Sequence, residues 1–381
     1  MSIHYTSKIL KASALIDDTL LLLLSWDLSL NQEENLSSIR NHNILVKASR
    51  SRLEDILVIL GITDEDRTNI KTEVGLPPIL QAPTPQDFTN RWIGYAIGII
   101  VGRFIPGEDG ALGSGIIDTH HTFSLETEQS LRYLTDTDAV TVLEEGHPDD
   151  LGEKIITALT LMLGEAGTTE ILAVLGGDMA TGAATIRSYM LKDFWKIHLQ
   201  WYRKRPIYWL IQSPKKEYSC YVFHERMTSD SLFLIQSARY LTGRINSLRS
   251  RISEVMEAIQ TAEGRERKAL EKEREQLEKA LVDCEELDSS LTRIIQKTNE
   301  TGKTVGWKPE LDDGVILNMA PLRELFLSWK AEPVKFWKEL EEGKYDWSYT
   351  AMRYWPTRVR TACKKNKSYA IAHGLEEEYE G

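Results

Sequence analysis

The sequence predicts an α+β fold that is mostly helical, in which a mixed domain with a β-hairpin is combined with a long antiparallel helical (coiled-coil) hairpin. Three patterns support this: apolar residues at helical spacing along most of the chain, a heptad repeat in residues 235–299, and one stretch rich in β-branched and aromatic residues. With 381 residues, of which 42% are hydrophobic and 27% charged, the composition is that of a soluble globular protein, and the chain is longer than one core usually serves. We divide it into four regions: 1–85, 86–234, 235–299 and 300–381.

Residues 1–85 are predicted to form an amino-terminal helical region. Apolar positions recur every three or four residues in "ILVKASRSRLEDILVILGI", and Gly61 is placed to end that helix. The most apolar run, Thr19–Trp26, is far shorter than the roughly 20 residues of a membrane helix. No basic segment followed by a cleavage site is present either. We therefore expect a cytoplasmic protein without a membrane segment.

The region 86–234 is predicted to be a mixed α/β domain. A glycine stands at every fourth position in "GYAIGIIVG", centred on Gly98, and predicts a helix face that packs closely on a neighbour. The stretch "GHPDDLGEKIITALTLMLGE" predicts an amphipathic helix capped by Asp149 or Asp150. A divalent-metal cluster that includes both of these and Glu153 is the alternative. Capping is favoured, because a helix start wants acceptors and negative charge.

A predicted β-hairpin in the same region carries a dense group of positive charge. The segments "IYWLIQ" and "EYSCYVF" have the composition of strands, and "SPKK" between them is turn material. The chain has a formal net charge of −11, and residues 86–199 contain 17 Asp or Glu against 7 Lys or Arg; yet residues 202–227 contain six Lys or Arg against two Glu. Three of these cations are expected at the base of the hairpin, two at its tip and one after its second strand: Arg203, Lys204, Arg205, Lys215, Lys216 and Arg226.

These six cations are candidate DNA-binding residues. Lysine and arginine neutralise phosphates and release counterions, while the Tyr and Trp side chains nearby can stack on bases or wedge between them. The alternative is a solvated turn whose aromatic side chains belong to the core.

Residues 235–299 are predicted to form the antiparallel helical hairpin. Apolar residues alternate by four and three before Gly264, a second apolar seam follows it, and the outer faces are charged. Most hairpins of this kind are spacers or interaction surfaces without chemistry. The seam positions are Leu241, Ile245, Leu248, Ile252, Val255, Ile259 and Ala262, followed by Leu270, Leu277, Cys284 and Leu291.

Residues 300–381 are predicted to form a mixed segment rich in aromatic residues. It contains a second group of cations, and the acidic tail "EEEYEG" is expected to be frayed. The cations are Arg353, Arg358, Arg360, Lys364, Lys365 and Lys367.

Several kinds of enzymatic site are absent from the sequence. The three cysteines are too widely spaced for a zinc clip, so reduced structural thiols are expected. In a P-loop built on "TGKT" the first glycine would fall at Lys297. The adjacent His120 and His121 lack a clear third ligand, and no HExxH or GxSxG motif occurs. We expect no catalytic residue, no metal site and no cofactor in this chain.

Long strings of the sequence resemble one family. They are "RWIGYAIGIIVGRF", "VLEEGHPDDL", "KRPIYWLIQSPKKEYSCYVFHERMTSDSLFLI", "LDDGVILNMAPL", "YDWSYTAMRYWPTRV" and "SYAIAHGLEEE". In this order they resemble the carboxy-terminal region of the adenine-specific DNA methyltransferases of phage-defence systems, above all the PglX type of BREX and its type IIG restriction-modification relatives. The resemblance covers about residues 86–378.

One departure from the family bears on activity. Members carry an amino-terminal catalytic domain with an S-adenosylmethionine loop and an (Asn/Asp)-Pro-Pro-aromatic motif that holds the flipped adenine. Here the only Pro-Pro pair is preceded by Leu76 and followed by Ile79. The resemblance therefore implies a part without the catalytic domain, a carboxy-terminal fragment or a separately encoded subunit, with S-adenosylmethionine bound elsewhere. In the family this part is associated with target recognition and helical spacing, so residues 86–234 would be a recognition-like domain.

Two functions follow as expectations, beside a third reading in which the chain is a degenerate remnant with no activity. In the first, the chain is the non-catalytic DNA-recognition and scaffold part of such a methyltransferase, with double-stranded DNA, the catalytic domain or subunit and other defence proteins as partners. In the second, it is a protein-interaction or regulatory module of the defence complex that does not itself bind DNA.

Overall fold

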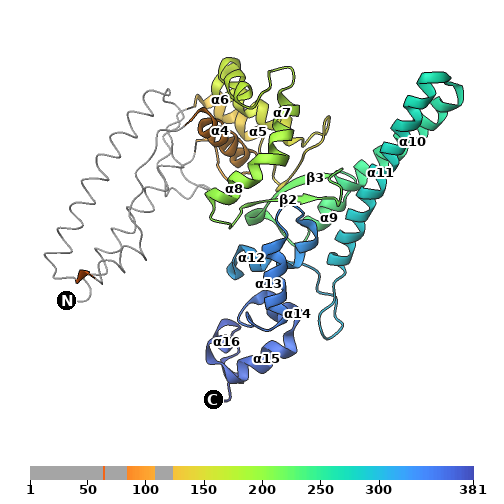
Figure 1. The fold of residues 1–381 in the computed structure, drawn as a ribbon. Helices are drawn as coiled ribbons and strands as arrows, with labels where there is room; N and C mark the ends of the chain where they lie inside the picture. Colours follow the sequence, from red (N-terminus) through yellow and green to blue (C-terminus); the bar gives the residue numbers. More distant parts are fainter. Residues whose placement is uncertain (1–62, 65–83, 108–122) are drawn as a thin grey trace. The chain divides into compact units, whose positions relative to one another are not determined.

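The computed structural model describes residues 63–64, 84–107 and 123–381, so the predicted helix that ends at Gly61 and the two adjacent histidines lie outside the described residues. The chain forms two compact units. The first holds the described residues up to Thr135 together with residues 157–179, and the second holds residues 136–156 and 180–381. The predicted fold class is confirmed, because the described residues are mostly helical with one small antiparallel sheet (Figure 1). The four region boundaries stay predictions.

The first unit contains α4 (Pro85–Ile100), α5 (Leu125–Tyr133) and the later part of α6 (Leu151–Val174). A capping box begins α4: Thr84 Oγ1 accepts a hydrogen bond from the Asp87 amide at 3.2 Å, and the Asp87 carboxylate accepts one from the Thr84 amide at 2.9 Å. Two of the amides that a helix start leaves unpaired are satisfied in this way.

The glycine pattern in α4 serves a close contact within this unit. A Cβ on Gly98 would lie 2.2 Å from the ring of Phe104, so only glycine lets the ring cross the helix at this point. Arg132 of α5 donates two hydrogen bonds, of 3.0 and 2.7 Å, to the carbonyl of Pro106 in the same loop. The predicted close packing is confirmed at Gly98, and its neighbour is the loop that follows the helix.

Among the described residues, α6 is the one helix that could cross a membrane by length and composition alone. Gly164 inside it has φ 71° and ψ 176°, which are not helical values, and it separates Leu151–Leu163 from Glu165–Val174. Each part is much shorter than the roughly 20 residues that a span requires. Helix α6 is better explained as two helical segments of a folded domain.

The sheet of the second unit has the strand order β1-β3-β2, and both pairings are antiparallel. The strands are β1 (Val140–Val142), β2 (Tyr208–Gln212) and β3 (Ser219–Phe223), and every residue in them is buried. Burial on both faces explains why the strands read as continuous apolar and aromatic runs without polar alternation. The predicted hairpin of β2 and β3 is confirmed.

Helical segments precede this hairpin. Helix α7 (Gly182–Tyr189), the π-helical turn η1 (Met190–Phe194) and α8 (Trp195–Trp201) follow one another directly. The hydroxyl of Tyr221 in β3 donates to the carbonyl of Met190 at 2.9 Å. The π-helical turn thus lies where a buried tyrosine of the sheet binds the helix backbone.

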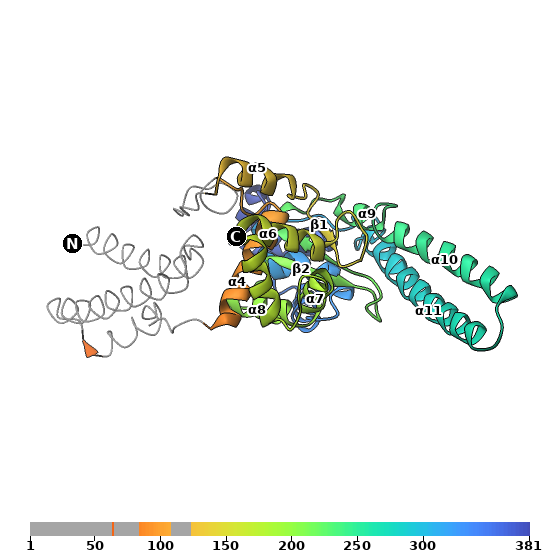
Figure 2. The same ribbon diagram turned by 90° about the horizontal axis from the view of Figure 1, so that it is seen from above.

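The two-helix hairpin consists of α10 (Leu241–Thr261) and α11 (Gly264–Ile295), which lie side by side in both views (Figures 1 and 2). Gly264, with φ 58°, begins the second helix directly after the turn. Seam positions such as Leu248, Val255 and Leu287 are buried, whereas Ile252, Ile259 and Leu277 are half-buried. Ion pairs between the two helices, Arg249 with Glu285 and Arg251 with Glu273, flank the seam.

The last part of the second unit packs around one small core. Trp337, Leu340, Tyr354 and Cys363 are buried there. The elements are η3 (Leu311–Asp313), α12 (Val315–Met319), η4 (Ala320–Leu325), α13 (Ala331–Glu341), α14 (Tyr349–Tyr354), α15 (Pro356–Lys365), α16 (Lys367–Ala372) and η5 (Glu376–Glu378).

The acidic tail is not frayed, which corrects the expectation for it. Glu378 forms an ion pair with Arg360, and Glu380 forms one with Lys364. The amide of Glu380 also donates to the carbonyl of Lys364 at 3.0 Å. The tail lies against α15 because its carboxylates pair with Arg360 and Lys364 of that helix.

Candidate nucleic-acid interface

The base of the β-hairpin carries three exposed cations. Arg203, Lys204 and Arg205 follow α8 directly, and the first two have left-handed backbones with φ 47° and 62°. The Lys204 amide donates to the carbonyl of Leu199 at 2.8 Å, which ends the helix. A helix carboxyl end also favours cations through its dipole, so these residues have a structural role besides any contact with a partner.

The tip of the hairpin carries the two lysines on a loop whose backbone is hydrogen-bonded to α11. The amides of Lys215 and Glu217 donate to the two carboxylate oxygens of Asp283 in α11, at 2.7 and 3.1 Å. Asp283 is 1% exposed. Lys216 has φ 69°, and its amide closes the turn on the carbonyl of Ser213 at 2.8 Å. Both lysine side chains are exposed, and within the described residues neither ammonium group has an ion-pair partner.

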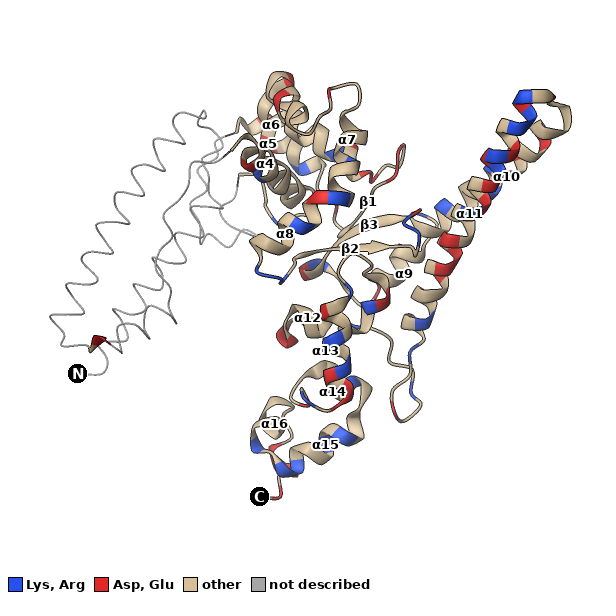
Figure 3. Cartoon of the chain, viewed as in Figure 1, with Lys and Arg blue, Asp and Glu red and all other residues tan. Residues whose placement is uncertain are grey.

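The six candidate cations therefore form two groups at opposite ends of the strand pair, as Figure 3 shows for the charged segments after α8 and between β2 and β3. The strand β2 alone is roughly 15 Å long, and two further residues on each side of it add to the distance between the groups. Arg226, in the short helix η2 (His224–Arg226), is half-buried and interacts with other groups of the chain. The positions at the base and at the tip agree with the sequence prediction, and a contact with DNA stays a prediction.

The hairpin aromatic residues do not face a partner, which corrects one expectation. Tyr208, Trp209 and Tyr221 are 2%, 0% and 1% exposed. Trp209 packs against Phe326 with their ring centroids 4.5 Å apart. These rings cannot stack on bases while the sheet is folded, because the core already surrounds them.

Asp150 caps α6, as predicted. Its carboxylate accepts hydrogen bonds from the amides of Gly152 and Glu153 at 3.3 and 3.1 Å, and from Arg187 Nε at 3.1 Å. Gly152 is required here, because a Cβ would lie 2.8 Å from the carbonyl oxygen of Ala183. These bonds occupy the carboxylate of Asp150 and support capping over the metal-cluster alternative.

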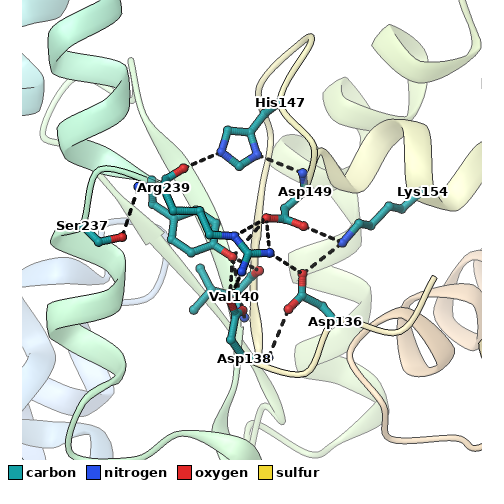
Figure 4. A network of polar contacts seen from close by, with 9 residues as sticks. Asp136, Asp138, Val140, His147, Asp149, Lys154, Ser237 and Arg239 are labelled. Atoms are coloured by element: carbon teal, nitrogen blue, oxygen red, sulfur yellow. Dashed lines mark hydrogen bonds and ion pairs between the residues drawn. The ribbon is translucent and has the colours of Figure 1, made fainter. Parts of the chain in front are cut away.

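Asp149 belongs to a partly buried network that joins three segments of the second unit (Figure 4). Its carboxylate accepts from Lys154 Nζ at 2.9 Å and from Arg239 Nε at 2.9 Å, and Lys154 also contacts Asp136 at 3.0 Å. Burial raises the pKa of Asp136. Burial acts in the same direction on Asp149, but hydrogen bonds from Lys154 and Arg239 outweigh it and lower the pKa of Asp149 to about 2.

A histidine completes this network. His147 Nδ1 accepts from the Asp149 amide at 2.9 Å, so its Nε2 carries the proton and donates to the carbonyl of Arg239 at 2.7 Å. Tyr240 donates its hydroxyl proton to Asp138 at 2.9 Å. Because its charged groups are mutually paired, the network holds the segment before α10 against the start of α6. Its geometry supports a structural role.

The cysteines and the possible metal ligands were the other candidates for chemistry in this chain. Cys220, Cys284 and Cys363 are free and buried, as predicted, and burial raises the pKa of Cys220 and Cys284 to about 12. Within the described ranges, no three His, Cys, Asp or Glu side chains converge in a way that could hold a metal ion.

Comparison with known proteins finds relatives of one class, the adenine-specific methyltransferases. No family model matches the chain. The chain is homologous to adenine-specific methyltransferases over part of their length. Adenine-specific methyltransferase BrxX of Escherichia coli O9:H4 (strain HS) is 24% identical over 277 residues, which are 66% of this chain and 22% of that protein. Adenine-specific methyltransferase PglX of Lacticaseibacillus casei (strain Zhang) is 30% identical over 177 residues, which are 44% of this chain and 14% of that protein. The matched regions thus span about a fifth of the relatives or less.

Proposed function

We propose that this chain is the non-catalytic DNA-recognition and scaffold part of an adenine-specific DNA methyltransferase of a phage-defence system, BREX-like or of the restriction-modification kind. The observation that carries the proposal is the homology to two adenine-specific methyltransferases over 277 and 177 residues. In this proposal, catalysis and the binding of S-adenosylmethionine belong to a separate domain or subunit. The motif expected to hold a flipped adenine does not occur around the Pro-Pro pair between Leu76 and Ile79.

The hairpin supplies the proposed contact with DNA. Arg203, Lys204 and Arg205 at the base and Lys215 and Lys216 at the tip are exposed and stand on backbone that hydrogen bonds hold in place. Because the two groups lie at opposite ends of the strand pair, they would neutralise phosphates at two separate places on the duplex. Such contacts position a protein on the duplex without reading bases.

The helical hairpin supplies the proposed scaffold. Helices α10 and α11 contact the rest of the second unit at one end, and their outer faces carry charges of both signs (Figure 3). The catalytic domain or subunit would dock on this surface.

The test is fluorescence anisotropy of the purified chain with duplex DNA across a salt series. The double variant Lys215→Gln, Lys216→Gln is compared with Lys268→Gln, Lys272→Gln, which removes the same charge from exposed positions of α11 near its turn. We expect the tip variant to make the slope of log K against log salt shallower by about two and the control variant to leave it unchanged. Equal salt slopes of DNA binding for wild type and the tip variant would show that Lys215 and Lys216 do not contact DNA. The pure chain should also transfer no methyl group from S-adenosylmethionine, and turnover would overturn the non-catalytic assignment.

A protein-interaction or regulatory module without DNA contact is the second candidate. The net charge of −11 and the long two-helix hairpin favour it. This function predicts that the chain retains a methyltransferase or another defence protein in a pull-down, while duplex DNA does not bind even at low salt.

A further inference from the structure

A small pocket lies between the end of α11, η4 and the helices α13 and α14 of the second unit. Its volume is about 110 Å³. Three cationic side chains and one carboxylate line it, together with two aromatic rings: Arg293, Lys297, Arg323, Glu324, Trp337 and Tyr354. The lining is therefore positive in an otherwise acidic protein.

Arg323 is a half-buried cation that the fold leaves largely unpaired. Its guanidinium lies over the ring of Trp337, 4.3 Å from the centroid. A guanidinium has five N–H donors, yet in the described part of the chain Arg323 makes a single hydrogen bond, of 3.4 Å, to the carbonyl of Pro321, and no ion pair. Burial lowers the pKa of Arg323, although Glu324 and Glu341 act in the opposite direction. Donors and charge therefore remain available for a ligand.

The other charged groups divide into a neutral pair and a second cation. Arg293 forms an ion pair of 3.0 Å with Glu324 and donates to Ser290 Oγ at 2.9 Å, so these two residues form a neutral edge. Lys297 is exposed, and its ammonium group has no ion-pair partner among the described residues. The positive charge of the pocket thus comes from Arg323 and Lys297.

The aromatic wall and the volume restrict what can enter. Trp337 Nε1 donates to Glu341 at 2.5 Å, and the Tyr354 hydroxyl donates to the carbonyl of Gly306 at 2.7 Å. Because their polar atoms are occupied, these two side chains offer ring surface only. Pockets for whole cofactors have volumes of about 300–1,000 Å³, whereas this pocket has about 110 Å³. A nucleoside is too large, and one tetrahedral oxyanion fits.

We propose that this pocket binds a single phosphate group, with Arg323 donating hydrogen bonds to it and Lys297 adding the second positive charge. The phosphate can belong to a nucleic-acid backbone or be free inorganic phosphate, since both present the same oxyanion. The proposal does not depend on the β-hairpin contacting DNA. If the phosphate is that of a backbone, the pocket adds an anchor to the proposed function.

Isothermal titration of the full chain with sodium phosphate, at constant ionic strength set with chloride, tests the proposal. We expect saturable binding that is weakened at least tenfold in Arg323→Gln, several-fold in Lys297→Gln, and unchanged in the control Lys268→Gln. Arg323→Lys keeps one charge and loses the forked donors, so it serves as a second variant if Arg323→Gln fails to fold, and circular dichroism monitors folding. The absence of saturable phosphate binding, or equal binding by wild type and both pocket variants, would sink the proposal.

A second arm identifies the source of the phosphate. Duplex affinity that falls in Arg323→Gln and is competed by inorganic phosphate assigns the pocket to the nucleic-acid backbone. Duplex affinity that is unchanged in a variant that has lost phosphate binding assigns it to free phosphate. Loss of duplex binding in the tip variant Lys215→Gln, Lys216→Gln with phosphate binding intact would separate the two surfaces, so failure of the hairpin proposal and failure of the pocket proposal give different results.

Discussion

Asp283 shows how one residue can position a surface that lies far away in the sequence. Its buried carboxylate accepts the amides of Lys215 and Glu217, which are 68 and 66 residues distant. Hydrogen bonds to a charged acceptor are short and strong. Asp283 thus fixes the backbone of the lysines at the tip, although the heptad pattern of α11 does not distinguish it from other polar positions.

Asp283→Ala should lower the free energy of unfolding by about 2 kcal/mol or more, because two amides lose a buried acceptor. Urea denaturation measures the change. Glu286→Ala, at an exposed position one turn away on α11, is the control and should stay within about 0.5 kcal/mol of wild type. A change for Asp283→Ala no larger than that of the control would contradict the role of this carboxylate.

A buried histidine predicts how stability depends on pH. The Asn318 side chain accepts from the Glu310 amide through Oδ1 at 2.9 Å, so its Nδ2 donates to His224 Nε2 at 2.7 Å. His224 is therefore neutral, and burial lowers its pKa to about 4. An unfolded chain takes up this proton near pH 6.5. The stability that neutral His224 contributes is thus complete above about pH 6.5 and is lost as pH falls toward 4.

Between pH 7 and pH 5 the histidine should cost the wild type about 2 kcal/mol of unfolding free energy. Other groups also titrate in this interval, so the informative quantity is the difference between wild type and His224→Gln, which keeps an acceptor for Asn318 and cannot titrate. Urea denaturation at both pH values measures it. A difference that does not change with pH would mean that His224 takes up its proton normally in the folded protein.

At the scale of elements, the start of α6 depends on a glycine that no helix propensity would select. The Cβ of an alanine at position 152 would lie 2.8 Å from the backbone oxygen of Ala183 and 2.8 Å from the side chain of Arg187. The backbone contact cannot be relieved by a side-chain rotation. Close packing of these two segments also brings Arg187 to the capping Asp150, with 3.1 Å between Nε and Oδ2.

Gly152→Ala should therefore destabilise the protein by about 1–2 kcal/mol, although alanine is the better helix former. Thermal and urea denaturation measure the change. The neighbouring Glu153→Ala removes an exposed carboxylate that lies 3.7 Å from Arg187, and we expect it to stay within about 0.5 kcal/mol of wild type. A more stable Gly152→Ala variant would show that α6 and the segment of Ala183 do not pack as closely as described.

At the scale of the whole molecule, the number of cations in a segment is a poor guide to its positive potential. Residues 346–376 have a cationic excess, but Arg353 pairs with Glu310, Arg358 with Asp346, and both Arg360 and Lys364 with the acidic tail. The lysines at the hairpin tip have no such partners within the described residues. Paired cations release fewer counterions from DNA than free ones.

The double variant Arg360→Gln, Lys364→Gln should therefore change the salt slope of duplex binding by less than one, whereas the tip variant changes it by about two. Anisotropy under the conditions of the hairpin test compares them directly. An equally large change for both pairs would mean that the tail leaves α15 when DNA binds.

Much of the fold could be predicted because it is written in local patterns. Period and composition placed the β2–β3 hairpin and the two long helices, and the capping chemistry of "GHPDD" identified the start of α6. The exposed cations at the base and tip of the hairpin follow from the same local order. These features depend on residues a few positions apart, which a linear sequence displays.

The pairing between distant segments was decided only by the tertiary structure. The sequence alone shows aromatic residues beside cations, whereas the structure shows that these rings, such as Trp209, are buried in the core. It shows a basic segment and an acidic tail, and the fold joined Glu378 to Arg360. It gives no sign that Asp283 would hold the hairpin tip, or that Arg323 and Lys297 would line one pocket. Periodicity records which face of an element is apolar, whereas the partner that a charged group meets depends on how elements pack in space, and no local pattern encodes that.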